Sequence, residues 1–176
     1  EVDVRRGIDD VLRLTSHRVH GIDVVCEYED VEPVLAHPSK LQQVWTNLIV
    51  NAAEAIEDEA ADLKARAEAN PASGIHLPAR GHDEARITIR AAMDGDQVEV
   101  QICDNGPGIA PEVLDRIMEP HFTTKAGRVR FGLGMGMSIV HSIIADLDGR
   151  LLIDSHPGYT TMRILIPAHH VHEEES

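Results

Sequence analysis

Aromatic and basic residues are both scarce in this sequence. Phe, Trp and Tyr make up 3% of its 176 residues, so a hydrophobic core has to be built from aliphatic side chains. There are 16 Lys and Arg against 30 Asp and Glu, which gives a formal net charge of −14. Because nucleic acids and anionic membranes attract basic surfaces, we expect this chain to bind neither of them.

Long apolar runs and a cysteine framework are also missing. No stretch approaches the roughly 18 consecutive apolar residues that indicate a membrane span, and no signal-peptide pattern follows Glu1. We therefore expect a cytoplasmic domain. Because the chain does not begin with Met, we expect it to be a piece of a longer protein, which could itself be membrane-attached. Cys26 and Cys103 each lie in an apolar, strand-like run, which predicts two buried, reduced thiols.

The rest of the sequence is typical of one folded domain. Hydrophobic residues make up 43% of the chain, and its length suits a single core, which we place in residues 1–167, followed by a polar tail at 168–176. Helical spacing of apolar residues predicts helices at residues 2–19, 38–69 (with a break near 56–58 as an alternative), 111–118 and 137–147. β-Branched residues and turn signals predict strands at residues 22–28, 85–93, 97–103, 150–155 and 160–166, and a surface loop at 71–84.

The order of these elements predicts the fold class. The last four strands form two hairpins, the first of them with the tight-turn dipeptide Asp94-Gly95. Few strands are apolar on both faces, so the helices should cover only one face of the sheet. We predict an α/β two-layer sandwich with a mixed, mostly antiparallel sheet.

Four polar or glycine-rich segments interrupt the hydrophobic pattern. They are NLIVNAAEA, which carries Asn47 and Asn51 one helical turn apart, DNGPG at residues 104–108, EPHFTTK at 119–125 and GLGMGMS at 132–138. Taken singly, each segment is weak evidence for a functional site, because a solvated helix face, a turn or a glycine cluster without function would explain it. The segment at 132–138 fits neither a P-loop, since Leu133 replaces the lysine, nor a dinucleotide fingerprint, since Ile139 replaces the third glycine.

In this order the four segments resemble the N, G1, F and G2 boxes of the ATP-binding catalytic domain of sensor histidine kinases. That domain belongs to a superfamily with gyrase B subunits, mismatch-repair ATPases and a class of heat-shock chaperones. The resemblance runs from Val2 to Pro167 and implies a Bergerat-type ATP-binding fold, with ATP and Mg²⁺ held between the two layers. It implies transfer of the γ-phosphoryl group to a histidine on a separate phosphoacceptor domain of the same protein. A response regulator is the implied indirect partner.

Strand alternation places two polar residues on the buried side of the sheet. Asp104 and Thr160 each have the parity of the apolar residues in their strands, so both should face the helices. The resemblance implies that Asp104 accepts a hydrogen bond from the adenine amino group and that Thr160 bridges to adenine. Guanine would present a carbonyl to Asp104 and be rejected. Gly106 and Gly108 would let the backbone approach the base.

The other segments are expected at the phosphates. The resemblance makes Asn51 the Mg²⁺ ligand, and an amide oxygen suffices because the triphosphate supplies the charge. Residues 116–130 carry a net charge of +3 in this acidic chain, and the resemblance implies a lid there. Glycines before a helix leave backbone N–H groups for phosphate oxygens. The expected nucleotide-binding residues are Asn47, Asn51, Asp104, Gly106, Gly108, Ile109, Phe122, Thr124, Lys125, Gly132, Leu133, Gly134, Met135, Gly136, Met137 and Thr160.

Two features bear on the reaction itself. The chain lacks the helix pair that carries the acceptor histidine, so the catalytic acceptor is expected outside it. ATP-hydrolysing members of the superfamily generally carry a glutamate one turn before the metal-binding asparagine, whereas this chain has Asn47 there, which predicts slow hydrolysis. Two alternatives are a non-catalytic ATP-binding regulatory switch and an anti-sigma-type protein-serine kinase. The EPHFTTK segment favours the histidine kinase by resemblance.

Overall fold

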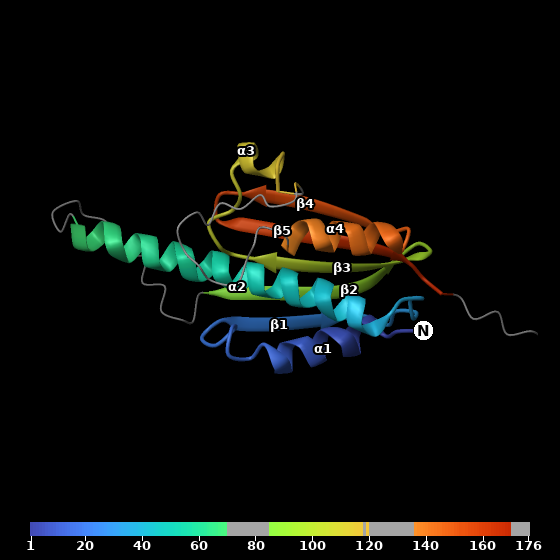
Figure 1. The fold of residues 1–176 in the computed structure, drawn as a ribbon. Coiled ribbons are helices and arrows are strands. Elements are labelled where there is room, and N and C mark those ends of the chain that lie inside the picture. The colour runs from blue at the N-terminus through green and yellow to red at the C-terminus, as the bar shows by residue number, and fades with distance from the viewer. Residues whose placement is uncertain (70–84, 118, 120–135, 170–176) are drawn as a thin grey trace, which may run out of the picture.

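The computed structural model describes residues 1–69, 85–117, 119 and 136–169. Within them the chain forms a five-stranded sheet with the strand order β1-β2-β3-β5-β4 (Figure 1). The elements are α1 (Val4–Leu14), β1 (Asp23–Tyr28), α2 (Pro38–Ala69), β2 (Arg86–Asp94), β3 (Gln97–Asp104), α3 (Pro111–Leu114), α4 (Gly136–Asp146), β4 (Arg150–His156) and β5 (Tyr159–Pro167).

The sheet is mixed and mostly antiparallel, as the sequence predicts. Strands β2 and β3, β3 and β5, and β4 and β5 pair antiparallel. Only β1 and β2 pair parallel among the described strands, because the long helix α2 lies between them in sequence and carries the chain back across the sheet. Both predicted hairpins form. Strand β2 is shifted by one residue from its prediction, and β3, β4 and β5 are longer than predicted by a residue at one or both ends.

One face of the sheet is covered by helices, which confirms the two-layer sandwich. The alternate strand residues that face the helices, such as Ile89 and Val100, are fully buried. They pack against the apolar side of α2, which contributes Trp45, Leu48 and Ile49. Figure 1 shows α2 and α4 crossing in front of the strands, with α1 beside α2. The core is aliphatic apart from Trp45, as the low aromatic content requires.

The opposite face of the sheet carries polar and charged ladders. Arg163 Nε donates to Glu99 Oε1 at 2.7 Å between neighbouring strands, and Arg90 Nε donates to Glu27 Oε2 at 2.6 Å. Such cross-strand pairs let one side of an antiparallel sheet face water.

Both cysteines are more exposed than predicted. Cys26 is exposed because β1 is an edge strand with a neighbour on one side only. Cys103 is half-buried on the polar face, where its sulfur accepts a hydrogen bond from Thr161 Oγ1 at 3.1 Å. Strand alternation explains this position, since the next residue, Asp104, faces the helices. The prediction of two buried thiols was therefore wrong.

Helix α1 is shorter than predicted, whereas α2 has the predicted bounds. Helix α1 ends at Leu14 instead of residue 19, because Thr15 caps it by donating from Oγ1 to Val11 O at 2.7 Å. Helix α2 runs unbroken over 32 residues, so the alternative with a break near residues 56–58 is wrong. The Ala, Glu, Lys and Arg residues beyond 56 sustain it by helix propensity, and it extends past the sheet in Figure 1.

Helix α3 covers only the first four residues of the predicted helix 111–118. The predicted loop at 71–84 lies outside the described residues. None of the helices among the described ranges is long and apolar enough to cross a membrane.

Helix α4 ends in a Schellman motif with an unusual residue at its left-handed position. Gly149 N donates to Ile144 O at 2.9 Å, and Asp148 N donates to Ala145 O at 3.0 Å. Asp148 has φ +54°, a conformation that glycine normally supplies at this point of the motif. The glycine stands one position later, where a Cβ on Gly149 would lie 2.5 Å from Leu165 O.

We predict that Asp148→Gly stabilises the protein. Removing the Cβ relieves the left-handed backbone, and the net gain should be roughly 0.5–1 kcal/mol in the free energy of unfolding. Urea denaturation measures it. The control, Ser142→Gly, places glycine at an exposed position inside α4 and should lower the stability by roughly 0.5 kcal/mol. A destabilised Asp148→Gly variant would contradict the strain argument.

Candidate functional site

Two asparagines of α2 meet the start of α4. Asn51 Nδ2 contacts Met137 Sδ at 3.5 Å, which turns the amide oxygen of Asn51 away from the sulfur. Asn47 Nδ2 donates to Gln43 O of its own helix at 2.8 Å. A Cβ on Gly136 would lie 3.1 Å from Asn47 Oδ1, so a glycine allows this close approach. The structure thus brings these four predicted residues together at the N-terminal end of α4.

Asp104 and Thr160 form a second polar group at the end of the sheet. They are partners in the register of β3 and β5, and their exposed fractions are 6% and 4%. Asp104 Oδ1 accepts a hydrogen bond from Gly106 N at 3.0 Å. The inward orientation that strand alternation predicted for both side chains is confirmed.

Two glycines hold the turn after β3 tightly between its neighbours. A Cβ on Gly106 would lie 2.8 Å from Asp104 Oδ1 and 3.4 Å from Ala55 Cβ of α2. Gly108 has φ +80°, and a Cβ there would lie 2.2 Å from His156 O. The turn therefore packs against α2 on one side and the β4–β5 hairpin on the other. No larger residue fits at Gly108, and at Gly106 a larger residue would displace the Asp104 carboxylate.

Ser155 is a site residue that sequence reasoning missed. Its Oγ accepts a hydrogen bond from Ile109 N at 2.8 Å, lies 2.9 Å from Thr160 Oγ1, and donates to Tyr159 O at 3.1 Å. It thereby ties the glycine-rich turn to Thr160. The predicted hairpin contained a signal for Ser155, because Ser155 and Thr160 are cross-strand partners in it.

A second missed feature is an ion pair on the α2 face that carries the asparagines. Arg18, in the turn between α1 and β1, contacts Glu54, one helical turn beyond Asn51. Arg18 has no sequence neighbour or spacing that marks it. Only the tertiary fold brings it to α2.

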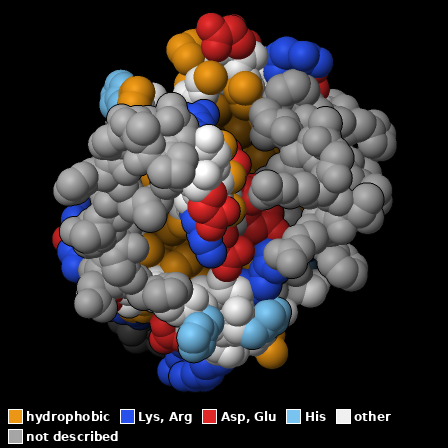
Figure 2. All heavy atoms as spheres, turned by 90° about the vertical axis from the view of Figure 1, so that its left-hand side faces the viewer, with side chains coloured by type: hydrophobic (Ala, Val, Ile, Leu, Met, Phe, Trp, Pro, Cys, Tyr) orange, Lys and Arg blue, Asp and Glu red, His pale blue; other side chains and the backbone are white. Residues whose placement is uncertain are grey.

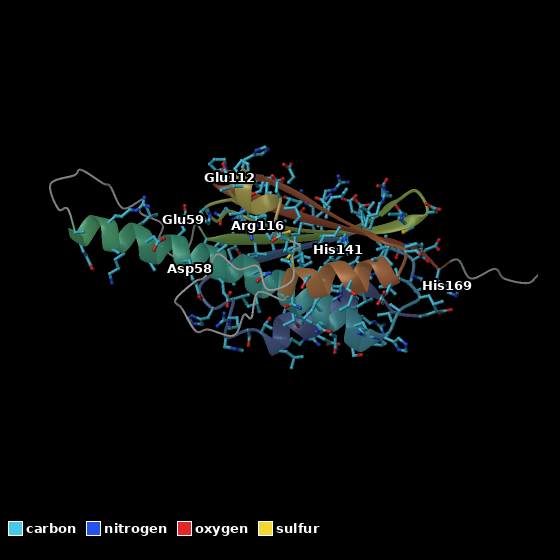
Figure 3. The ribbon with its side chains drawn as sticks, turned by 45° about the horizontal axis from the view of Figure 1, so that its top comes forward. Asp58, Glu59, Glu112, Arg116, His141 and His169 are labelled. Carbon is cyan, nitrogen blue, oxygen red and sulfur yellow. The ribbon has the colours of Figure 1, made fainter. Side chains whose placement is uncertain are left out.

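Burial dominates the electrostatics of Asp104. Loss of water raises the pKa of its carboxyl to about 6, the Gly106 N–H lowers it in part, and the charge of Glu59 on α2 raises it again. Figure 3 labels Glu59 on the part of α2 that extends beyond the asparagines. Figure 2, which views that end of the molecule, shows acidic side chains at the centre of the face with basic ones beside them.

The remaining predicted residues lie outside the described part of the chain. They are Phe122, Thr124, Lys125, Gly132, Leu133, Gly134 and Met135. Arg116, at the start of the basic segment, lies in the turn that follows α3 (Figure 3).

Sequence comparison identifies the family. A model of the histidine kinase-, DNA gyrase B-, and HSP90-like ATPases matches residues 36–170. The chain belongs to this family. Membership implies that the nucleotide of the site is ATP, and the match includes both polar groups described above.

The curated relatives are bacterial sensor kinases. The sensor kinase CckA of Brucella abortus is 34% identical over 160 residues, which are 89% of this chain and 16% of that protein. The histidine kinase/phosphatase NtrB of Rhizobium meliloti is 37% identical over 138 residues, 77% of this chain and 32% of that protein. This chain therefore spans about a third or less of either relative.

Solved structures share the fold. The nucleotide-free catalytic domain of the histidine kinase ThkA superposes with a TM-score of 0.70 at 25% identity, over 95% of this chain and 93% of that one. Full-length ShkA, solved in complex with AMPPNP, gives a TM-score of 0.72 at 23% identity, over 97% of this chain and 31% of that one. The second likeness is one of fold alone.

We predict that Asp104→Asn stabilises the protein without nucleotide. The folded-state pKa of about 6 exceeds the ordinary 3.8, so the native state holds the proton more tightly, and stability falls as the pH rises between these values. At pH 7.5 the ionised carboxylate costs roughly 3 kcal/mol, which asparagine avoids while still accepting from Gly106 N.

Urea denaturation at two pH values checks this. The gain from Asp104→Asn should be largest at pH 7.5 and should shrink near pH 4, where the wild-type carboxyl is largely protonated. A gain that is equal at both pH values would mean that the charge of Asp104 is not its source.

Proposed function

We propose that this chain is the ATP-binding catalytic domain of a sensor histidine kinase. It binds Mg-ATP between the helices and the sheet and transfers the γ-phosphoryl group to a histidine of a phosphoacceptor domain. The observation that carries the proposal is the presence of two groups of polar residues, Asp104 beside Thr160 and Asn51 beside Met137, in a family of ATPases whose matched relatives are sensor kinases.

The Asp104 end supplies the selection for adenine. Its buried carboxylate accepts from one backbone N–H and has acceptor capacity left. The adenine amino group donates a hydrogen bond there, whereas the guanine carbonyl would face a second acceptor in a dry site. Thr160, held by Ser155, lies in register with Asp104 and offers a hydroxyl to the same edge of the base.

The Asn51 end suits a magnesium ion and phosphates. Contact of the Asn51 amide nitrogen with Met137 Sδ leaves the amide oxygen, a hard donor of the kind that Mg²⁺ prefers, for the cleft. Within the described ranges, no group of three or more His, Cys, Asp or Glu side chains could hold a metal. When bound, the ion would neutralise charge on the phosphates.

The transfer itself requires positioning more than protein chemistry. An imidazole nitrogen of the acceptor bonds to the γ-phosphorus as the bond to the β–γ bridging oxygen breaks, and ADP leaves. Asn47 stands where a general base for water would be needed, and an amide does not take a proton at neutral pH. Bound ATP is therefore kept from hydrolysis until the histidine arrives.

The partner is a phosphoacceptor domain of the same protein, with a response regulator downstream. The relatives are several times longer than this chain, which leaves room for that domain. Two histidines of this chain do precede an acidic residue, namely His82 and His172, and both lie outside the described residues. Control variants at these two positions make a test of self-phosphorylation unambiguous.

We predict that Asp104→Asn weakens ATP binding although it stabilises the fold. Loss of a hydrogen bond to a charged group should raise the Kd by about 10- to 150-fold, measured by titration calorimetry with Mg-ATP. The matched control is Asp96→Asn at the opposite end of β3, which should leave the Kd unchanged. Unchanged affinity in a folded Asp104→Asn variant would refute the adenine assignment.

The kinase activity is tested with a phosphoacceptor domain added in trans. We predict that labelled ATP leaves the chain itself unlabelled, with or without His82→Ala and His172→Ala, and labels the acceptor domain. Phosphate release without acceptor should stay well below the roughly 1 s⁻¹ of slow kinases. Acid-stable label on the chain would instead indicate a serine kinase. Binding without any transfer would indicate a regulatory switch.

A further inference from the structure

An ion pair joins the segment after α1 to the face of α2 that carries the asparagines. Arg18 Nη2 donates to Glu54 Oε1. The exposed fractions of the two side chains are 29% and 16%, so the carboxylate is more enclosed than the guanidinium. Arg18 therefore keeps part of its surface accessible to a ligand.

The position of this pair relative to the asparagines follows from helix geometry. Asn47, Asn51 and Glu54 follow one another at steps of four and three residues, which places them on one face of α2. Asn47 approaches Gly136, and Asn51 contacts Met137, both at the start of α4. Glu54 thus lies three residues, roughly 4.5 Å of helix rise, beyond the amide of Asn51 that we assign to the metal and the phosphates.

The charges of the neighbouring site residues indicate a role for Arg18. Among the described side chains of the site, Asn47 and Asn51 are neutral, Asp104 is a carboxyl, and Glu59 acts on Asp104 through its charge. An ATP triphosphate brings several negative charges next to them, and a cation is needed there. A guanidinium has more N–H donors than one carboxylate occupies, and its planar fork suits phosphate oxygens.

We propose that Arg18 binds the outer phosphates of ATP and that Glu54 positions it for this. The inference rests on the proposed nucleotide site. It adds a residue from outside the four motif segments. Because the pair is neutral as a whole, Arg18 acts by direct N–H donation to phosphate oxygens and not by long-range attraction.

The test is the dependence of affinity on the number of phosphates. Kd values for Mg-ATP, Mg-ADP, AMP and adenosine are measured by calorimetry for the wild-type chain and for Arg18→Ala. We expect about tenfold weaker binding of ATP, a smaller loss for ADP, and adenosine within about twofold of wild type. Arg18→Lys, which keeps a donor and the charge, should recover part of the ATP affinity.

Two controls separate a ligand contact from a structural one. Arg13→Ala removes a nearby exposed arginine that pairs with Asp10 within α1, and it should change none of the four affinities. Equal losses for adenosine and ATP in Arg18→Ala would show that Arg18 only supports the fold, and they would overturn the proposal. So would an ATP affinity that does not change.

A double-mutant cycle tests the part played by Glu54. If Glu54 acts by holding Arg18, Glu54→Ala should change the ratio of ATP to adenosine affinity in the wild-type background and not in Arg18→Ala. Equal changes in both backgrounds would overturn the positioning role. If the wild-type chain binds no ATP, the proposed function fails. If it binds ATP and the Arg18→Ala profile is flat, only this inference fails.

Discussion

The burial of one carboxylate is the constraint on which the site depends. Asp104 ends a strand whose inward residues are otherwise apolar, so its charge lies beside aliphatic side chains with a single backbone donor. That donor is Gly106 N, and a Cβ on Gly106 would lie 2.8 Å from Asp104 Oδ1, so a larger residue would require the carboxylate to shift. The glycine-rich turn is thus required as much by the solvation of Asp104 as by the reversal of the chain. Without ligand, the native state still bears a desolvation cost that a hydrogen-bond donor in the cleft would offset.

Helix α2 fixes the distance between this carboxylate and the phosphate end. Ala55 packs against Gly106, Asn51 contacts Met137, and Asn47 approaches Gly136. These contacts come from one straight element, so a shift at one end is transmitted to the other. A single helix anchored in the core by Trp45 and Leu48 is a rigid support of the kind that a site for positioning a phosphoryl group requires.

The sequence predicts those features of the site that depend on local patterns, and it does not predict those that depend on tertiary contacts. Strand alternation has a period of two residues, so it placed Asp104 and Thr160 correctly on the buried face and the hairpins within about a residue or two of their ends. The same rule places Cys103 on the polar face, between the inward-facing Ile102 and Asp104. The apolar residues around Cys103 in the sequence predicted the opposite, a buried thiol. Cys26 could not be placed, because exposure at a sheet edge depends on strand order, which no local pattern encodes. Arg18 meets Glu54 only through the packing of α1 beside α2, and a long-range contact of one arginine has no sequence signature.

In the proposed nucleotide site, the two ends differ in the groups that they offer to a ligand. Glu59 and Asp104 make the adenine end acidic, which suits the amino group of the base and repels phosphate. At the other end of the proposed site, the backbone N–H groups at the start of α4 and the N–H groups that Arg18 does not give to Glu54 would donate to phosphate oxygens. ATP bound the wrong way round would place its phosphates beside two carboxylates and its base beside unsatisfied donors. In the proposed site, this order of groups therefore favours ATP with its base at Asp104 and its phosphates at the start of α4.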